Sequence, residues 1–250
     1  MMERKKNNWI KNLLATLFWV AAWHILAISI ENPLLLPTPV QVIRRLWELM
    51  ATESFWRSAS MSIGRILAGA VAALVLGVVL AVMTTASSLL QALVEPLMTA
   101  VQATPVASIT ILVLIWLDRD YVPVLICAMM VLPVVWNNVC VGIRTTDPKL
   151  LELAKVYRLS GFQTLRRIYI PSVMPYFRAA CSSGLGLGWK AGIAAEVLTV
   201  PKASIGKMIS ESKLYLMTED LFAWTLAVVL LSLALQKLML KILTGRANHA

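Results

Sequence analysis

Long apolar stretches are the feature of this sequence that most restricts its fold. Several of them reach the roughly 18 apolar residues needed to cross a bilayer core about 30 Å thick. Charged residues make up only 14% of the 250 residues, whereas soluble domains carry about 25%. Together these properties exclude an ordinary cytosolic protein and predict an all-α membrane protein.

Six membrane spans are predicted from the apolar stretches, within one domain that covers residues 1–250. The first stretch is longer than the 7–15 apolar residues of a secretory signal, so it is expected to stay as a membrane anchor. The six predicted spans are Leu13–Ile30, Ile63–Thr84, Leu97–Leu117, Val122–Ile143, Val173–Val200 and Leu221–Leu243.

The distribution of Lys and Arg predicts the orientation of these spans. Residues 1–11 hold four of these cations, residues 144–167 hold six and residues 237–250 hold three. The intervening loops contain fewer Lys and Arg residues. Residues 85–96 are expected on the same side as the Lys- and Arg-rich segments, but they contain neither residue. Because cytoplasmic loops carry an excess of Lys and Arg, both termini and residues 144–167 are expected in the cytoplasm of a cell-membrane protein.

Several other functions are disfavoured by composition. The net charge of +10 gathers beside apolar spans, so it indicates cytoplasmic loops and not nucleic-acid binding. Cys127, Cys140 and Cys181 lie in apolar surroundings and are expected to be buried packing residues. The only histidines are His24 and His249, so no metal site, cofactor or catalytic residue is predicted.

Two segments outside the spans have helical periodicity. In residues 31–62, Val40, Ile43, Trp47 and Met50 recur at helical spacing, which predicts an amphipathic helix at the outer interface. In residues 144–171, Asp147-Pro148 is typical of a helix start.

A second short helix is predicted after Arg158–Gly161, because Ser160 and Gln163 have the spacing of a capping box. Pro171 is expected to end it before the fifth span. The apolar stripes of these two helices need a partner, which is either the protein's own membrane domain or a cytoplasmic protein.

This loop resembles the EAA loop of permeases of bacterial ATP-binding-cassette (ABC) importers. Glu152-Leu153-Ala154 and Ile168-Tyr169-Ile170-Pro171 match the family pattern E-A-A, three residues, G, nine residues, I-x-L-P. Ile170 conservatively replaces the leucine of the pattern. Two positions depart more strongly, because Leu153 replaces an alanine and Arg158 stands where the family has glycine. Three further stretches are similar to the nitrate/sulfonate/taurine branch of the family: residues 35–39, residues 144–148 and residues 188–196.

The resemblance implies the type I (MetI-like) importer permease fold and several partners. The implied partners are an ABC ATPase subunit, an extracytoplasmic solute-binding protein, a second copy of the permease and membrane lipid. The loop at residues 147–171 would couple ATP hydrolysis to transport, and the solute would be a small anion of the sulfonate, taurine or nitrate class. The coupling residues implied are Glu152, Ala154, Arg158, Gly161, Ile168 and Pro171.

Charged residues inside the spans are candidates for the translocation pathway. Lys190 lies beyond the membrane midplane and could attract an anion, or it could extend to the outer surface. Glu196 is a possible partner for Lys190, whereas Arg65 is expected to extend to the surface. The glycines of the same span, such as Gly188 and Gly192, predict close helix packing and not a phosphate loop.

Other functions remain as alternatives. The same kind of importer could carry an aromatic or pyrimidine compound, because recognition belongs largely to the binding protein. A secondary transporter should show inverted repeats with midplane ion ligands, which the sequence lacks. A membrane-embedded enzyme would need nucleophile, base or metal-binding residues that are also missing.

Overall fold

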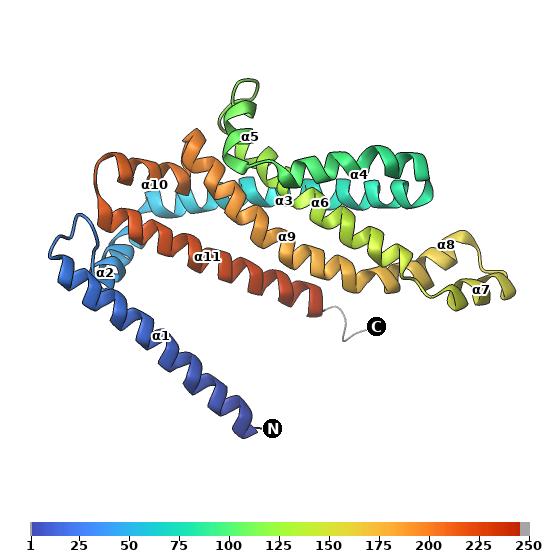
Figure 1. The fold of residues 1–250 in the computed structure, drawn as a ribbon, viewed down its shortest axis with the longest axis horizontal. Coiled ribbons are helices and arrows are strands. Elements are labelled where there is room, and N and C mark those ends of the chain that lie inside the picture. Colours follow the sequence, from blue (N-terminus) through green and yellow to red (C-terminus); the bar gives the residue numbers. More distant parts are fainter. Residues whose placement is uncertain (1, 246–250) are drawn as a thin grey trace.

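The computed structural model describes the backbone of residues 2–245 and the side chains of residue 11, residues 13–239 and residue 241. Within that part of the chain, every regular element is helical, as predicted (Figure 1). The elements are α1 (Met2–Ile30), α2 (Pro39–Met50), α3 (Glu53–Ala86), α4 (Ser88–Ala103), α5 (Val106–Val113), α6 (Val122–Arg144), α7 (Pro148–Val156), α8 (Gly161–Thr164), the π-helix η1 (Leu165–Tyr169), α9 (Ile170–Thr199), α10 (Ile205–Leu214) and α11 (Thr218–Gly245).

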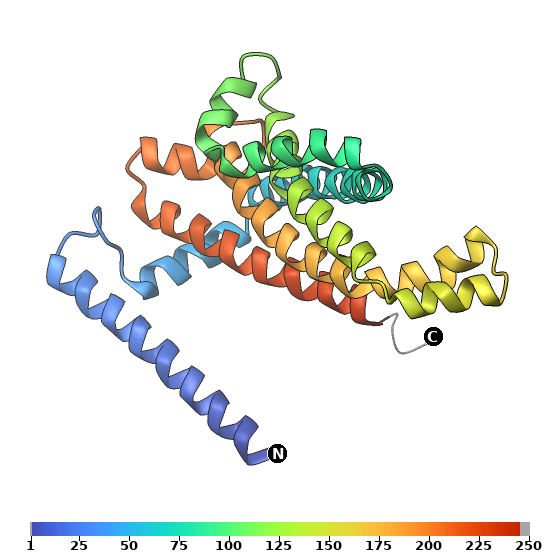
Figure 2. The same cartoon turned by 45° about the vertical axis from the view of Figure 1, so that its right-hand side comes forward.

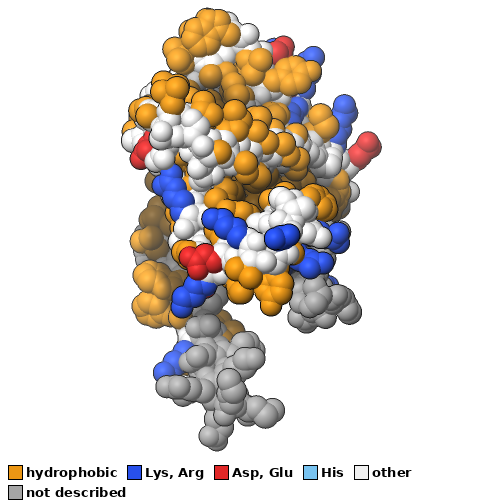
Figure 3. Space-filling model, turned by 90° about the vertical axis from the view of Figure 1, so that its right-hand side faces the viewer, with side chains coloured by type: hydrophobic (Ala, Val, Ile, Leu, Met, Phe, Trp, Pro, Cys, Tyr) orange, Lys and Arg blue, Asp and Glu red, His pale blue; other side chains and the backbone are white. Residues whose placement is uncertain are grey.

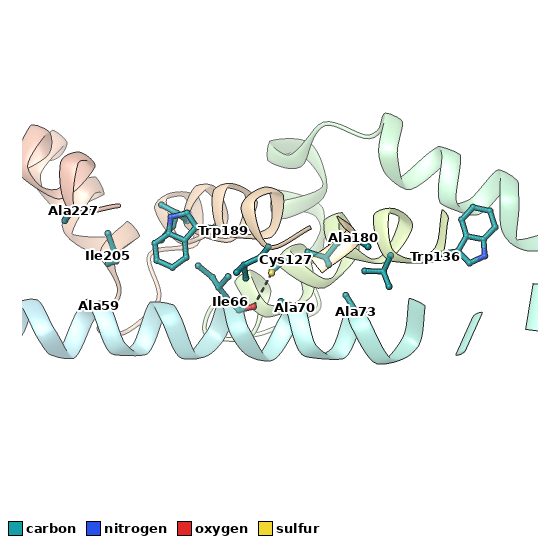
Figure 4. Close-up of a cluster of buried hydrophobic side chains, with 14 of the residues drawn as sticks. Ala59, Ile66, Ala70, Ala73, Cys127, Trp136, Ala180, Trp189, Ile205 and Ala227 are labelled. Atoms are coloured by element: carbon teal, nitrogen blue, oxygen red, sulfur yellow. Dashed lines mark hydrogen bonds between the residues drawn. The ribbon is translucent and has the colours of Figure 1, made fainter. Parts of the chain in front are cut away.

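Helices α3, α6 and α9 form the centre of the bundle. Ile66 of α3, Cys127 of α6 and Trp189 of α9 are buried there (Figure 4). The Cys127 thiol donates a hydrogen bond to the backbone oxygen of Ile66 at 3.3 Å. All three cysteines are buried, which confirms that they are packing residues.

Glycines allow α9 to approach its neighbours closely. A Cβ added at Gly188 would lie 2.8 Å from Sγ of Cys127, and one at Gly192 would lie 2.7 Å from Cγ1 of Ile66. Such distances are too short for a real Cβ atom. The predicted close packing at these two glycines is therefore confirmed, with Gly188 against α6 and Gly192 against α3.

The predicted third span, Leu97–Leu117, is wrong as a single helix. The chain breaks between α4 and α5, whose axes differ by 103°. Thr104 has φ −78° and ψ 128°, the extended conformation that a following proline favours, and Pro105 precedes α5. Pro105, which lies within an apolar run, thus turns one predicted span into a bent pair of helices.

Fewer than six helices in the described part of the chain have the length and hydropathy expected of a membrane span, although six spans were predicted. Among the described residues, four helices qualify, and five if the bent α4–α5 pair counts as one span. The predicted span Val173–Val200 does not qualify, because glycines, Lys190 and Glu196 lower its mean hydropathy. It nevertheless forms the 30-residue helix α9 at the centre of the bundle.

The helix predicted between the first two spans is present as α2, and its place at the outer interface stays a prediction. Thr38 caps it through a capping box with Gln41, and Pro39 is its first residue. Arg45 holds α2 against α11 through hydrogen bonds to Asp220, one of them 3.1 Å long between Nη2 and Oδ2. These bonds raise the pKa of Arg45.

Helix α1 stands apart from the remaining helices in both views (Figure 1, Figure 2). Only 6% of its apolar window is buried within the chain. Its main links are a hydrogen bond of 3.1 Å from Trp23 Nε1 to the Pro37 oxygen and stacking of Trp23 on Phe222. Its exposed apolar surface therefore has to be covered by lipid or by another subunit.

Candidate coupling hairpin and buried charges

Helices α7 and α8 form a hairpin that projects beyond one end of the bundle (Figure 1). Asp147 caps α7 by accepting a hydrogen bond from the Lys149 amide at 2.9 Å, and Pro148 is its first residue. Ser160 caps α8, and Gln163 completes the capping box. Both helix starts predicted from the sequence are confirmed.

Arg158 forms the turn of this hairpin in a left-handed conformation, with φ 51°. The Leu159 amide donates to the Ala154 oxygen at 2.9 Å, and the Arg158 amide donates to the Lys155 oxygen at 3.0 Å. These two bonds define a Schellman motif that ends α7, with Arg158 at the position that usually holds glycine. The glycine of the family pattern thus corresponds to a real backbone requirement, which this chain meets with arginine.

Gly161, three residues after the turn at Arg158, has no special backbone conformation. The described residues include no glycine with positive φ, and a Cβ at Gly161 would meet nothing within 4 Å. Gly161 is the exposed first residue of α8, behind the Ser160 cap. The turn requirement lies three residues earlier, at Arg158.

Pro171 does not end the helix that begins at Gly161, contrary to expectation. Tyr169 and Ile170 are both right-handed helical, so α8, η1 and α9 follow one another without a break. The Ile170 amide bonds to the Leu165 oxygen, five residues earlier. This π-helical segment ends at Tyr169, two residues before Pro171, a residue that has no amide hydrogen to donate.

The hairpin exposes apolar side chains at its tip. Val156, Tyr157 and Phe162 are 75%, 74% and 71% exposed. Ala154 and Ile168 are buried, whereas Glu152 is exposed on the side of α7. Basic side chains lie among apolar ones on this end of the molecule (Figure 3). The tip therefore offers an apolar patch with basic neighbours to another molecule.

The opposite end contains a buried charge cluster that was missed in the sequence. Glu196 is fully buried; its Oε2 accepts hydrogen bonds from Ser62 Oγ at 2.6 Å and from the Gly206 amide at 3.2 Å. Its Oε1 lies 3.4 Å from Nη1 of Arg65. Glu196 is therefore paired with Arg65 and not with Lys190.

Arg65 is buried, so the expectation that it extends to the surface is wrong. It lies 3.4 Å from Asp120 and donates to the backbone oxygens of Lys202 and Ala203 at 2.7 and 3.2 Å. The cluster thus joins α3, α9, the loop before α6 and the loop before α10. The charges of Arg65 and Glu196 inside the predicted spans were the sequence signal for it, but their pairing was not predicted.

Lys190 is exposed on α9. Ser183, Leu187 and Ala194 are exposed on the same face, spaced three or four residues apart. No residue within the described part of the chain forms an ion pair with the Lys190 ammonium.

Comparison with known proteins identifies the family to which this architecture belongs. Residues 73–244 match the family described as binding-protein-dependent transport system inner membrane component. The chain belongs to this family. Such proteins are the membrane-embedded permease subunits of ABC importers, which work with an ATPase and a solute-binding protein and are not themselves enzymes.

Individual permeases resemble the chain over most of its length. The putative aliphatic sulfonates transport permease protein SsuC of Bacillus subtilis is 25% identical over 88% of this chain and 80% of its own length. The taurine transport system permease protein TauC of Escherichia coli is 23% identical over 86% and 80%. The nitrate import permease protein NrtB of Leptolyngbya laminosa is 25% identical over 76% and 71%. The resemblance to the nitrate/sulfonate/taurine branch is thereby confirmed.

Proposed function

We propose that this permease carries a small anionic solute of the sulfonate, taurine or nitrate class, delivered by a binding protein. The names of the relatives support this class, and Lys190 offers a cation on an exposed face of α9. Purified permease, ATPase and binding protein in vesicles should import one of these labelled anions. If none of these anions were imported, the proposed solute class would be refuted, but the assignment as a permease would stand.

We further propose that the α7–α8 hairpin docks on the ATPase. The observation that carries this proposal is the projecting tip, with Val156, Tyr157 and Phe162 between 71% and 75% exposed. Large apolar side chains of that exposure are costly in water, so burial against a partner would stabilise the complex. The coupling role of the six residues implied by the resemblance is part of this proposal: Glu152, Ala154, Arg158, Gly161, Ile168 and Pro171.

The proposed assembly contains two copies of the permease, with lipid around them and both termini cytoplasmic. The described ends of α1 and α11, the α3–α4 turn and the hairpin all lie toward the same end of the bundle, which is compatible with this orientation (Figure 1). The side chains of Arg4, Lys5, Lys6 and Arg246, which contribute to the charge argument, lie outside the described residues.

Copurification of the ATPase with permease variants tests the docking site. Tyr157→Asp and Phe162→Asp should remove the ATPase and abolish uptake, because each places a charge in the apolar patch. Leu214→Asp is the matched control, since Leu214 is 74% exposed but lies at the opposite end. Retention of the ATPase and of uptake in both tip variants would show that the hairpin is not the docking site.

A further inference from the structure

Helix α4 has two exposed faces of opposite character. Leu89, Leu93 and Leu97 are 69%, 63% and 59% exposed and recur every four residues, so they form an apolar stripe. Gln91, Glu95, Thr99 and Gln102 recur at spacings of four, four and three on another face; we call these four residues the polar stripe.

The polar stripe faces α6 across a hollow. The stripe lines a cavity of about 220 Å³ together with Asn137 and Arg144, which are two turns apart on α6. Met98, Trp136, Cys140 and Val141 complete the lining. From Gln91 to Gln102 the stripe covers about 16 Å, at 1.5 Å per residue. It begins near the α3–α4 turn and Arg144 ends α6, so the hollow occupies the half of the bundle next to the hairpin (Figure 1).

The polar groups of this hollow are largely unused within the chain. Gln91 Nε2 donates to Oε2 of Glu95 at 3.2 Å, but both residues belong to α4. Within the described part of the chain, the side chains of Gln102, Asn137 and Arg144 form no hydrogen bond or ion pair. By contrast, both carboxylate oxygens of Glu196 are bonded by groups of its own chain.

Residues 85–96 were expected to form a loop, but most of them belong to α4, which passes the test for a membrane span together with α5. A carboxylate and several amides on such a helix are costly against lipid tails. The apolar stripe of α4 is suited to lipid, so the polar stripe has to meet water or protein. A hollow with hydrogen-bonding walls that opens away from the chain's own core satisfies this requirement when it is filled with water. The hollow therefore has the polarity expected of a water-filled part of a transport pathway.

We propose that the polar stripe, Asn137 and Arg144 line the water-filled inner half of the translocation pathway. This inference rests on the proposed function, because the inner half of the pathway is the exit for the transported solute. Glu95 and Arg144 place one negative and one positive group on the same small hollow. A purely anionic solute is repelled by Glu95, so the hollow favours a small solute that carries an amino group beside its acidic group.

Reaction of single cysteines with charged thiol reagents tests the proposal without any solute. The background carries Cys127→Ala, Cys140→Ala and Cys181→Ala, and the complete importer is placed in membrane vesicles. Cysteine at position 95, 99 or 102 should react with membrane-impermeant reagents added from the hairpin side. Leu93→Cys and Leu97→Cys are the matched controls on the apolar stripe and should react at least tenfold more slowly. Equal reaction rates on the two stripes would overturn the proposal. Disulfide formation between two permease copies at the polar stripe, with no labelling of that stripe, would also overturn it.

The charge of the reagent tests the solute class. Thr99→Cys should react with a cationic reagent at least as fast as with an anionic one, and adding Glu95→Gln should lower this ratio at least threefold. Glu53→Gln, at the far end of α3, should leave the ratio unchanged. A ratio that Glu95→Gln does not alter would overturn the role of Glu95. Because no solute is used, failure to import sulfonate, taurine and nitrate would refute the proposed solute class and leave this result standing.

Discussion

Replacing Arg158 with glycine should stabilise the coupling hairpin. Arg158 has φ 51°, and a residue with a side chain pays about 1–2 kcal/mol for this left-handed conformation, whereas glycine does not. Glycine loses more backbone freedom on ordering, which offsets roughly 0.5–1 kcal/mol of the gain. The expected net effect is therefore about 0.5–1 kcal/mol, or a roughly two- to fivefold smaller fraction of opened hairpin.

Hydrogen exchange of the Leu159 amide measures this effect directly, because that amide bonds to the Ala154 oxygen and is released when the turn opens. Its exchange should slow about two- to fivefold in Arg158→Gly. Arg158→Ala is the decisive control, since it removes the guanidinium but keeps a Cβ in the left-handed conformation. Equal slowing in the glycine and alanine variants would attribute the effect to charge and refute the backbone argument.

Three further predictions concern the membrane helices. Gly69→Ala should destabilise the protein by about 1–3 kcal/mol in thermal unfolding, because its Cβ would lie 2.3 Å from a backbone oxygen of α6. Gly64→Ala, on the same helix with nothing within 4 Å, should not destabilise, and equal losses in both variants would contradict the packing argument. Glu196→Gln should lower the free energy of unfolding by about 3 kcal/mol, because it leaves Arg65 without its buried partner. Combining Glu196→Met with Arg65→Met should lower it by less. A larger loss in the double variant would show that the pair is not the relevant interaction. Lys190→Met should reduce anion uptake while ATPase capture is kept and Lys190→Arg transports normally; normal uptake by Lys190→Met would remove Lys190 from the pathway.

The hairpin was predictable because its determinants are local. Asp147-Pro148 and the Ser160–Gln163 capping box each act within four residues, so both helix starts could be placed without a structure. The requirement for a left-handed residue at Arg158 was not visible, because arginine carries no sign of it. Only the family pattern, with glycine at that position, marked the turn.

The charges in the spans show a different limit. Their existence is plain in the sequence, but their partners depend on how helices far apart in the chain are arranged. Arg65 and Glu196 are 131 residues apart and meet only because α3 and α9 pack together. Lys190 is close to Glu196 in sequence, yet it points to another face of α9 and stays exposed.

The same reasoning separates structural charges from transport charges. Arg65 and Glu196 are satisfied by groups of their own chain, and two residues beside them, Val200 and Ala203, are held at φ 49° and 44°. Such a conformation is unfavourable for valine and persists only where surrounding bonds enforce it. This cluster therefore fixes the end of the bundle opposite the hairpin. Glu95 and Arg144 lack partners of that kind from another helix within the described residues, and this difference is what makes them, and not Glu196, the charges available to a passing solute.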